Sequence, residues 1–419
     1  MTFASLGVHP DLLGPLAGFE APTPVQTAVI PAILGGRDVW ASAPTGSGKT
    51  AAYVLPILQA LAAEPARRPR PVRALILAPT RELAAQIGDV VEQLGRDLPE
   101  PLQTRVAFGG VSINPQMMSL RGGADIVVAT PGRLLDLVEH NALVLYAVRT
   151  LVLDEADRML SLGFADELAR VLSLLPATRQ SLLLSATFPP AVKTLAAALL
   201  RDPVRVVVTA PIPTSPGEGA LAHRAIEVDT DKRTRLLLRL LETHDWPQVL
   251  VFVASRHGAD HLAAKLRKAG IAAGALHGDL AQGTRTRALA DLATKRSRVL
   301  VATDVAARGL DIVGLPAVIS YDLPRSSADY THRAGRTARA GATGVAVSFV
   351  VAADRAHFQL IEKRNLFVAP IEQIEGFIPT EVAPAGDPHG GVKGARKSKK
   401  DKLREAAALV ESADWRWKR

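Results

Sequence analysis

Short apolar runs alternate with helical patterns through most of the chain, and one stretch that suits neither structure divides this alternation into two halves. The expected strands are 38–42, 74–78, 105–108, 125–129, 150–153, 181–184 and 204–208, then 224–228, 249–253, 299–302, 318–321 and 345–350. Strands that alternate with helices form parallel sheets covered by helices. Between the halves, residues 209–219 contain three prolines and two glycines, which interrupt regular structure. We therefore predict two α/β domains, 1–208 and 223–370, joined by a linker at 209–222.

The size of the chain is compatible with two domains: it has 419 residues, of which 48% are hydrophobic. No apolar run reaches the roughly 18 residues that a membrane span requires, and the first residues lack a secretory pattern. We therefore expect a cytoplasmic protein that binds no membrane. The absence of cysteine excludes disulfides and thiolate metal sites.

Most of the positive charge lies at the end of the chain. Residues 390–419 contain ten Lys or Arg and four Asp or Glu, a net of 10 − 4 = +6 out of the total of +9. We expect 371–419 to be a basic, disordered tail. Trp415 and Trp417 lie among basic residues there, so the tail either stacks on single-stranded bases or only solubilises the protein.

A glycine-rich segment follows the first expected strand. Backbone N–H groups of such a loop bind phosphate oxygens, and a following helix N-terminus adds positive potential. Here Lys49 would reach the β and γ phosphates and the Thr50 hydroxyl would bind Mg²⁺. The other predicted phosphate-loop residues are Thr45, Gly46, Ser47 and Gly48.

An acidic run, Asp154-Glu155-Ala156-Asp157, begins 105 positions after Lys49 and directly follows an expected strand. Asp154 would hold the same Mg²⁺ ion. Glu155 would orient and deprotonate the attacking water. The loop and the acidic run together predict a nucleoside triphosphatase.

The second half carries a basic run, 332–339, in which Arg336 and Arg339 are three positions apart. On a helical turn both guanidinium groups would lie on one face. Arginine suits a phosphoryl group in transit because it stays charged and donates a planar fork of hydrogen bonds. If both residues reach across the interdomain cleft, they act as arginine fingers and hydrolysis requires domain closure.

With these motifs in this order, residues 3–350 resemble a DEAD-box RNA helicase of superfamily 2, most closely the bacterial RhlE-like group. The resemblance implies two tandem RecA-like domains, ATP and Mg²⁺ as cofactors, and RNA, single-stranded or in short duplexes, bound largely without regard to sequence. Its implied activity is local separation of short duplexes or remodelling of RNA–protein complexes. We expect a monomer, with ribosomal or degradosome proteins as candidate partners.

The resemblance also assigns residues. Gln26 would bind the adenine edge and Asp311 the ribose, with Phe19 and Phe3 as further nucleotide contacts, although Phe3 equally suits core packing. Ser185 and Thr187 would bond with Asp157 and, in the closed state, sense His332. The implied RNA contacts are Pro79, Thr80, Arg81, Gly110, Thr130, Pro131, Gly132 and Arg133 in the first domain, and Arg256, Gln282, Arg285 and Thr303 in the second.

The chain departs from the family pattern at three positions. Pro44 stands where Gln is usual and removes one N–H from the phosphate loop. Ala338 replaces Gly between the two arginines, where we expect a helix to accept its methyl group, and Ala334 replaces a larger apolar residue. Two rival functions stay open: an RNA clamp that uses ATP only to lock onto RNA, and a DNA-directed translocase.

Overall fold

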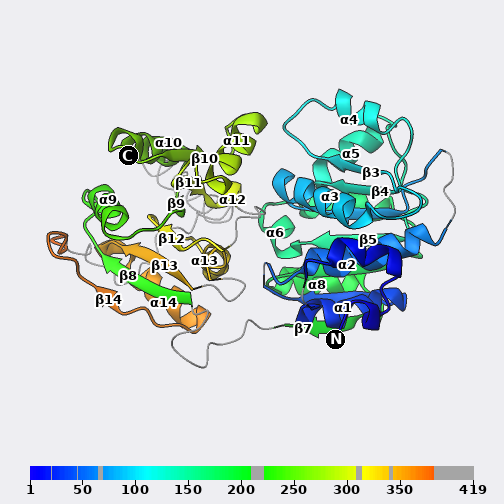
Figure 1. Cartoon of the computed structure of the whole chain (residues 1–419), viewed down its shortest axis with the longest axis horizontal. Coiled ribbons are helices and arrows are strands. Elements are labelled where there is room, and N and C mark those ends of the chain that lie inside the picture. Colours follow the sequence, from blue (N-terminus) through cyan, green and yellow to red (C-terminus); the bar gives the residue numbers. More distant parts are fainter. Residues whose placement is uncertain are drawn as a thin grey trace, which may run out of the picture.

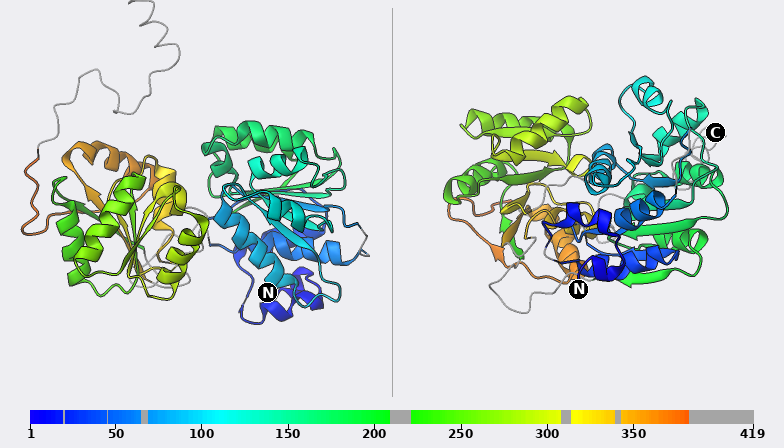
Figure 2. Two further views of the ribbon diagram at one scale, coloured as in Figure 1. Left: turned by 90° about the horizontal axis from the view of Figure 1, so that it is seen from above. Right: turned by 45° about the vertical axis from the view of Figure 1, so that its right-hand side comes forward.

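The computed structural model describes residues 1–19, 21–44, 46–64, 69–208, 221–307, 314–338 and 343–381. The described residues form two domains, each built on a seven-stranded sheet (Figure 1). Seen from above, the domains are separate lobes that lie side by side (Figure 2). Among the described helices, none combines the length and hydropathy needed to cross a bilayer.

The two sheets share one topology. The first contains β1 (Val39–Ser42), β2 (Ala74–Leu77), β3 (Thr104–Ala107), β4 (Ile126–Ala129), β5 (Thr150–Asp154), β6 (Gln180–Ser185) and β7 (Val204–Val207), in the order β3-β4-β2-β5-β6-β1-β7. The second contains β8 (Leu221–Glu227), β9 (Val249–Val253), β10 (Ala273–Leu276), β11 (Val299–Thr303), β12 (Ala317–Ser320), β13 (Gly344–Val350) and β14 (Ile371–Glu372), in the order β10-β11-β9-β12-β13-β8-β14. All of these strand pairs are parallel, and the second order repeats the first, strand for strand.

Helices cover both faces of each sheet. The first domain has α1 (Pro24–Leu34), α2 (Lys49–Ala62), α3 (Arg81–Gly95), α4 (Asn114–Ser119), α5 (Pro131–Glu139), α6 (Ala156–Ser161), α7 (Ala165–Ser173) and α8 (Pro190–Leu199). The second has α9 (Arg233–Thr243), α10 (Arg256–Lys268), α11 (Gln282–Ala293), α12 (Asp304–Ala307), α13 (Ser327–Ala334) and α14 (Arg355–Asn365). Short 3-10 turns occur at Ala4–Leu6, Pro10–Leu12, Gly14–Leu16 and Ala352–Asp354.

Alternating strand residues enter two separate cores. In β2, Ile76 packs with α1, α2 and α3, whereas Leu75 and Leu77 pack with α5 to α8 on the opposite face. All four residues of β2 are buried. This is why the expected strands are continuous apolar runs rather than alternating ones.

Every strand expected from the sequence is present, with ends that differ by up to three residues. Two further strands, β10 and β14, were not expected. β14 pairs with β8, and Phe377 packs into the second core. The boundary predicted at residue 370 is therefore wrong, because the chain continues to pack on the second domain through Glu381, whose N–H donates to Asp229. Of the linker predicted at 209–222, residues 209–220 lie outside the described residues, as does the tail from 382 onward, whereas 221 and 222 already belong to β8.

Candidate nucleotide and nucleic-acid sites

The topology sorts the predicted motifs of the first domain into two groups. The phosphate loop, the acidic run and the Ser185 segment follow β1, β5 and β6, which are neighbours in the sheet. The RNA segments follow β2, β3 and β4, which are also neighbours. Parallel strands end at one edge, where open α/β sheets bind ligands. The nucleotide motifs therefore share one half of this edge and the RNA motifs the other.

Side chains of the phosphate loop donate hydrogen bonds to carbonyl groups of the same loop. Lys49 is the first residue of α2, and its Nζ donates to the carbonyl oxygens of Ala43 at 2.7 Å and Pro44 at 2.8 Å. Ser47 Oγ also donates to the Pro44 carbonyl, at 2.7 Å. Gly48 has a φ of 89°, which favours glycine. Pro44 thus lacks an N–H, but its carbonyl oxygen accepts hydrogen bonds from Ser47 and Lys49. Phosphate oxygens would have to replace this carbonyl as the acceptor. Thr45 lies outside the described residues.

The predicted magnesium ligands come from adjacent elements of the same half. Asp154 ends β5, and Thr50 lies in the first turn of α2. Burial raises the pKa of Asp154 to about 6, whereas the charge of Lys49 opposes this rise. Asp154 Oδ1 accepts the N–H of Glu155, and Oδ2 accepts the Tyr53 hydroxyl, each at 2.9 Å. One carboxylate and one hydroxyl fit Mg²⁺, which takes oxygen ligands and usually keeps several waters and phosphate oxygens.

Glu155 is held in an unusual backbone conformation. Its φ of 52° and ψ of 50° are left-handed, a strained state that clusters at functional sites. Arg158 Nη1 donates to Glu155 Oε2 at 2.5 Å. Burial raises the pKa of Glu155, but the charges of Arg158, Arg336 and Lys49, joined at low pH by that of protonated His332, outweigh burial and hold this pKa below its ordinary value. Glu155 is therefore ionised at neutral pH.

The predicted bonds between the acidic run and the Ser185 segment are present. The N–H of Asp157 donates to Ser185 Oγ at 3.2 Å, and Thr187 Oγ1 donates to Asp157 Oδ2 at 2.5 Å. His332 of the second domain lies within electrostatic reach of Asp157 and Glu155. Burial and, less strongly, the charge of Arg158 lower the pKa of His332 to about 4. The imidazole is therefore neutral at pH 7.

The expected helix through both arginines is absent. Helix α13 ends at Ala334, and Arg336 follows in a turn. Ala338 has a φ of 51°, so the prediction that a helix accepts its methyl group is wrong. The chain turns here because Thr337 Oγ1 donates to the Leu315 carbonyl and holds the segment against the sheet. Arg336 is buried near enough to Glu155 to lower its pKa. Arg339 lies outside the described residues.

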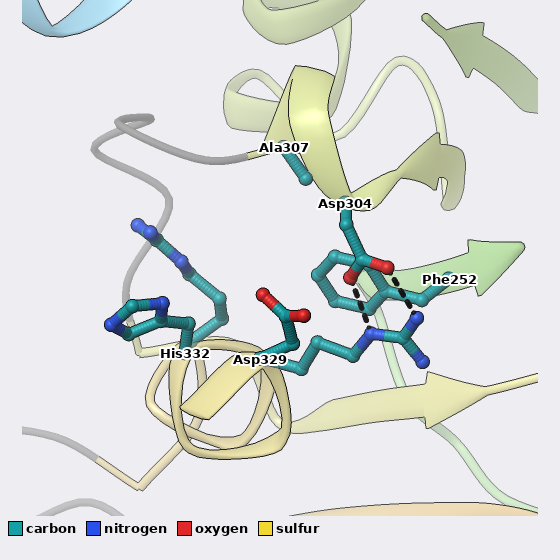
Figure 3. A pocket seen from close by; sticks show the side chains of 7 residues that line it. Phe252, Asp304, Ala307, Asp329 and His332 are labelled. Carbon is teal, nitrogen blue, oxygen red and sulfur yellow. Dashed lines mark hydrogen bonds and ion pairs between the residues drawn. The ribbon is translucent and has the colours of Figure 1, made fainter. Parts of the chain in front are cut away.

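A small pocket lies beside these residues on the second domain (Figure 3). It is lined by Phe252, Asp304, Ala307, Asp329, His332, Arg333 and Arg336. Arg333 makes a two-pronged ion pair with Asp304, at 2.6 and 2.7 Å, and its guanidinium lies over the Phe252 ring. In Figure 3, His332 and Asp304 lie on opposite sides of Asp329. The ion pair joins α12, which begins at Asp304, to α13, which carries His332.

The residues predicted to bind the base are not equally placed for it. Phe3 is 6% exposed and packs in the first core, as the core-packing alternative predicts, and its contact with adenine stays a prediction. Phe19 is 54% exposed and stays available. Gln26 closes a capping box with Thr23 and donates from Nε2 to the Gly48 carbonyl at 3.2 Å. Its amide therefore links helix α1 to the phosphate loop. Asp311 lies outside the described residues.

The predicted RNA contacts of the first domain gather at the ends of β2, β3 and β4. The Arg81 guanidinium packs against Gly110, where an added Cβ would meet Nη1 at 2.4 Å. Arg133 Nη2 donates to the Val111 carbonyl at 2.9 Å. The remaining predicted RNA contacts lie at the starts of helices. Pro79 and Thr80 directly precede α3, Thr130 directly precedes α5, and Pro131 and Gly132 are the first residues of α5.

The predicted RNA contacts of the second domain follow β9, β10 and β11, the corresponding half of the second sheet. Arg256 begins α10 and pairs with Asp279, Gln282 begins α11, and Thr303 ends β11. Arg285 differs from the others, because its Nη2 lies 2.6 Å from Glu82 Oε1 of the first domain. Their side chains are only 4% and 7% exposed. Arg285 therefore makes an interdomain contact, and its role in RNA binding stays a prediction.

Comparisons with known proteins agree with this geometry. Residues 23–195 match the DEAD/DEAH box helicase family, and residues 232–341 match the helicase conserved C-terminal domain. The chain is 43% identical over 356 residues to the ATP-dependent RNA helicase SrmB of Escherichia coli, covering 84% of this chain and 79% of SrmB. The chain belongs to the DEAD-box family of helicases. It is also 40% identical over 388 residues to DEAD-box ATP-dependent RNA helicase 30 of Arabidopsis thaliana. This match covers 90% of this chain and 64% of the Arabidopsis protein.

Solved DEAD-box structures show the same pair of RecA-like domains. Dbp5 of Saccharomyces cerevisiae bound to RNA and ADP BeF3 superimposes with a TM-score of 0.78 at 30% identity, covering 89% of this chain and 95% of that one. For the Dbp5 variant bound to Nup159, Gle1, IP6 and ADP, the TM-score is 0.61 at 29% identity, over 88% of this chain and 95% of that one. The arrangement of the two lobes is therefore more similar to the RNA-bound Dbp5.

Two residues of this DEAD-box site, Tyr53 and Arg158, were not predicted from the sequence. Tyr53 and Arg158 each lie three positions after a predicted site residue, Thr50 and Glu155. On a helix this spacing places two side chains on one face, so the signal was available in the sequence. The RhlE-like assignment within the family stays a prediction.

Proposed function

We propose that this protein is an ATP-dependent RNA helicase that binds RNA without regard to sequence and separates short duplexes by domain closure. The observation that carries the proposal is that His332 and Arg336 of the second domain lie within electrostatic reach of Glu155 of the first, and His332 also of Asp157. Catalytic groups would thus come from both domains. Hydrolysis would then occur only in the closed arrangement.

The side chains divide the chemistry of ATP hydrolysis. Lys49 would exchange its bonds to the Ala43 and Pro44 carbonyls for phosphate oxygens. Glu155 would accept a hydrogen bond from the attacking water and orient it. Arg336 would donate to the γ-phosphate oxygens, and we propose Arg339 as its companion. Mg²⁺ held by Thr50 and Asp154 would supply charge neutralisation at the phosphates.

RNA would run along the other half of both sheet edges, from the ends of β2, β3 and β4 to those of β9, β10 and β11. The groups there are helix N-termini, hydroxyls and arginines, which contact phosphate and ribose and position a strand without specifying its bases. Closure that bends one strand would exclude its partner. RNA-bound Dbp5 supports this path by analogy. We further propose a cytoplasmic monomer, with ribosomal or degradosome proteins as candidate partners.

Strand displacement tests this proposal. We expect a short RNA duplex to be separated with ATP, less with a non-hydrolysable analogue, and not by the Arg336→Gln protein. Arg170→Gln is the matched control, because Arg170 makes only an exposed ion pair with Glu139 on the first domain. Tight RNA binding without displacement would favour the clamp instead. Equal stimulation of ATP hydrolysis by DNA and RNA would favour the translocase.

A further inference from the structure

Tyr53 carries a polar group into the first hydrophobic core. It lies on α2 and is fully buried, at 0% exposure, among the apolar residues that cover one face of the first sheet. A buried hydroxyl without a partner costs about 1–3 kcal/mol, so a buried tyrosine normally has a specific partner. Here the hydroxyl donates to Asp154 Oδ2 at 2.9 Å. Phenylalanine would fill the same space without this requirement.

The second predicted magnesium ligand lies close to the Tyr53 hydroxyl as well. Thr50 lies one helical turn before Tyr53 on the same face of α2, near enough for its side chain to lower the pKa of Tyr53, which burial and Asp154 raise. Asp154 receives its other donor, the N–H of Glu155, on Oδ1. The carboxylate is therefore held by one donor on each oxygen. Two donors at these positions fix the rotation of the carboxylate beside Thr50.

We propose that Tyr53 is a positioning residue that orients Asp154 for the magnesium ion of the nucleotide complex. The proposal rests on the proposed ATP-dependent function. Ligand groups that are already oriented lose less conformational freedom when the metal binds, which raises affinity. Loss of the hydroxyl would leave the protein able to bind nucleotide but would weaken the contribution of Mg²⁺ to that binding.

The test is the gain in affinity for a fluorescent ADP that Mg²⁺ provides over EDTA, measured by equilibrium titration. We expect Tyr53→Phe to reduce this gain about tenfold, the low end for a hydrogen bond to a charged group, and to leave affinity in EDTA unchanged. The matched control is Tyr330→Phe, which removes another buried tyrosine hydroxyl, bonded to His223 Nδ1 at 2.8 Å in the second domain. The Tyr330→Phe protein should show the same increase in ADP affinity with Mg²⁺ as the wild type.

A second arm separates positioning from general stability. In an Asp154→Asn background, where no carboxylate remains to be oriented, Tyr53→Phe should cause no further loss of the magnesium gain. An unchanged gain in the single Tyr53→Phe protein would overturn the proposal, as would an equal loss in Tyr330→Phe. If the wild-type protein bound ADP equally in Mg²⁺ and EDTA, the proposed function itself would fail, and that result is visible before any variant is made.

Discussion

The ion pair between Glu82 and Arg285 gives a direct test of how the two lobes close. The resemblance assigns Arg285 to RNA, whereas the structure places it against Glu82 of the other domain, with both side chains nearly inaccessible to solvent. Arg285 Nη1 also donates to the His277 carbonyl at 3.1 Å, which anchors the guanidinium within its own domain. If this pair holds the closed state, either partner should matter equally.

The size of the effect follows from burial. Removing one member of a buried ion pair leaves an uncompensated charge, which costs about 3–5 kcal/mol. In the open state each charge returns to water and its loss costs little, so nearly the whole penalty acts on closure. The pair lies at the domain boundary, where water relieves part of the penalty. We therefore expect about 2 kcal/mol against closure, equivalent to a roughly 30-fold loss of coupling between ATP and RNA.

The assay is the RNA concentration that half-maximally stimulates ATP hydrolysis, measured for Arg285→Gln, Glu82→Gln and the double variant. Both single variants should raise this concentration to a similar extent, and the double variant should be no worse than either, because the interaction is lost only once. Arg170→Gln should behave as wild type.

A different pattern would refute the interdomain role. If Arg285→Gln alone weakened RNA binding, also without nucleotide, and Glu82→Gln had no effect, Arg285 would be an RNA ligand as the resemblance implies. The salt dependence would then confirm this, because loss of a phosphate contact lowers the slope by about one unit.

Three further predictions concern single residues. Ala338→Gly should stabilise the protein against urea by up to about 1 kcal/mol, since alanine is strained at a φ of 51°, whereas Ala334→Gly within α13 should destabilise it by about as much. Glu155→Gln should lower the turnover of ATP at least about 100-fold while nucleotide affinity is kept; turnover near the wild-type rate would remove Glu155 from the base role. Burial lowers the pKa of His223 to about 4, so the unfolded chain binds the extra proton below about pH 6.5, and stability falls as pH drops from 6.5 towards 4. Between pH 7 and 5 the wild type should lose about 1 kcal/mol more than His223→Gln, after allowance for partial exposure; equal losses would contradict this.

The strands could be predicted because burial on both faces leaves a simple signature. β9, with the sequence Val-Leu-Val-Phe-Val, is entirely buried and is rich in residues that favour strands. β10 was missed because its residues, Ala-Gly-Ala-Leu, have weak strand preference, and only the neighbouring strand β11 specifies their conformation. β14 was missed because two residues carry no pattern.

The site residues could be predicted where a local motif fixes the chemistry, and not where a distant partner does. The bonds of Ser185 and Thr187 to Asp157 follow from motifs that end neighbouring strands. In contrast, Glu82 and Arg285 are 285 − 82 = 203 residues apart, and their pairing depends on how two separately folded domains meet. The turn at Ala338 was missed for a related reason, since α13 ends at Ala334 and Thr337 is then bonded to Leu315, 22 positions earlier in the chain.

The repeated strand order explains why ATP and RNA binding can be linked by one motion. Because both sheets have the same order, each carboxyl edge is divided in the same way, with nucleotide groups over one half and RNA groups over the other. Among the described residues, the lobes come together in both halves: His332 and Arg336 lie within electrostatic reach of Glu155 in the nucleotide half, and Arg285 meets Glu82 beside the RNA half. Two separated contacts between rigid bodies restrict their relative orientation far more than one does. An orientation that satisfies the nucleotide contact therefore also satisfies the RNA-side contact, so each ligand stabilises the arrangement that the other requires, and their effects on affinity must be reciprocal.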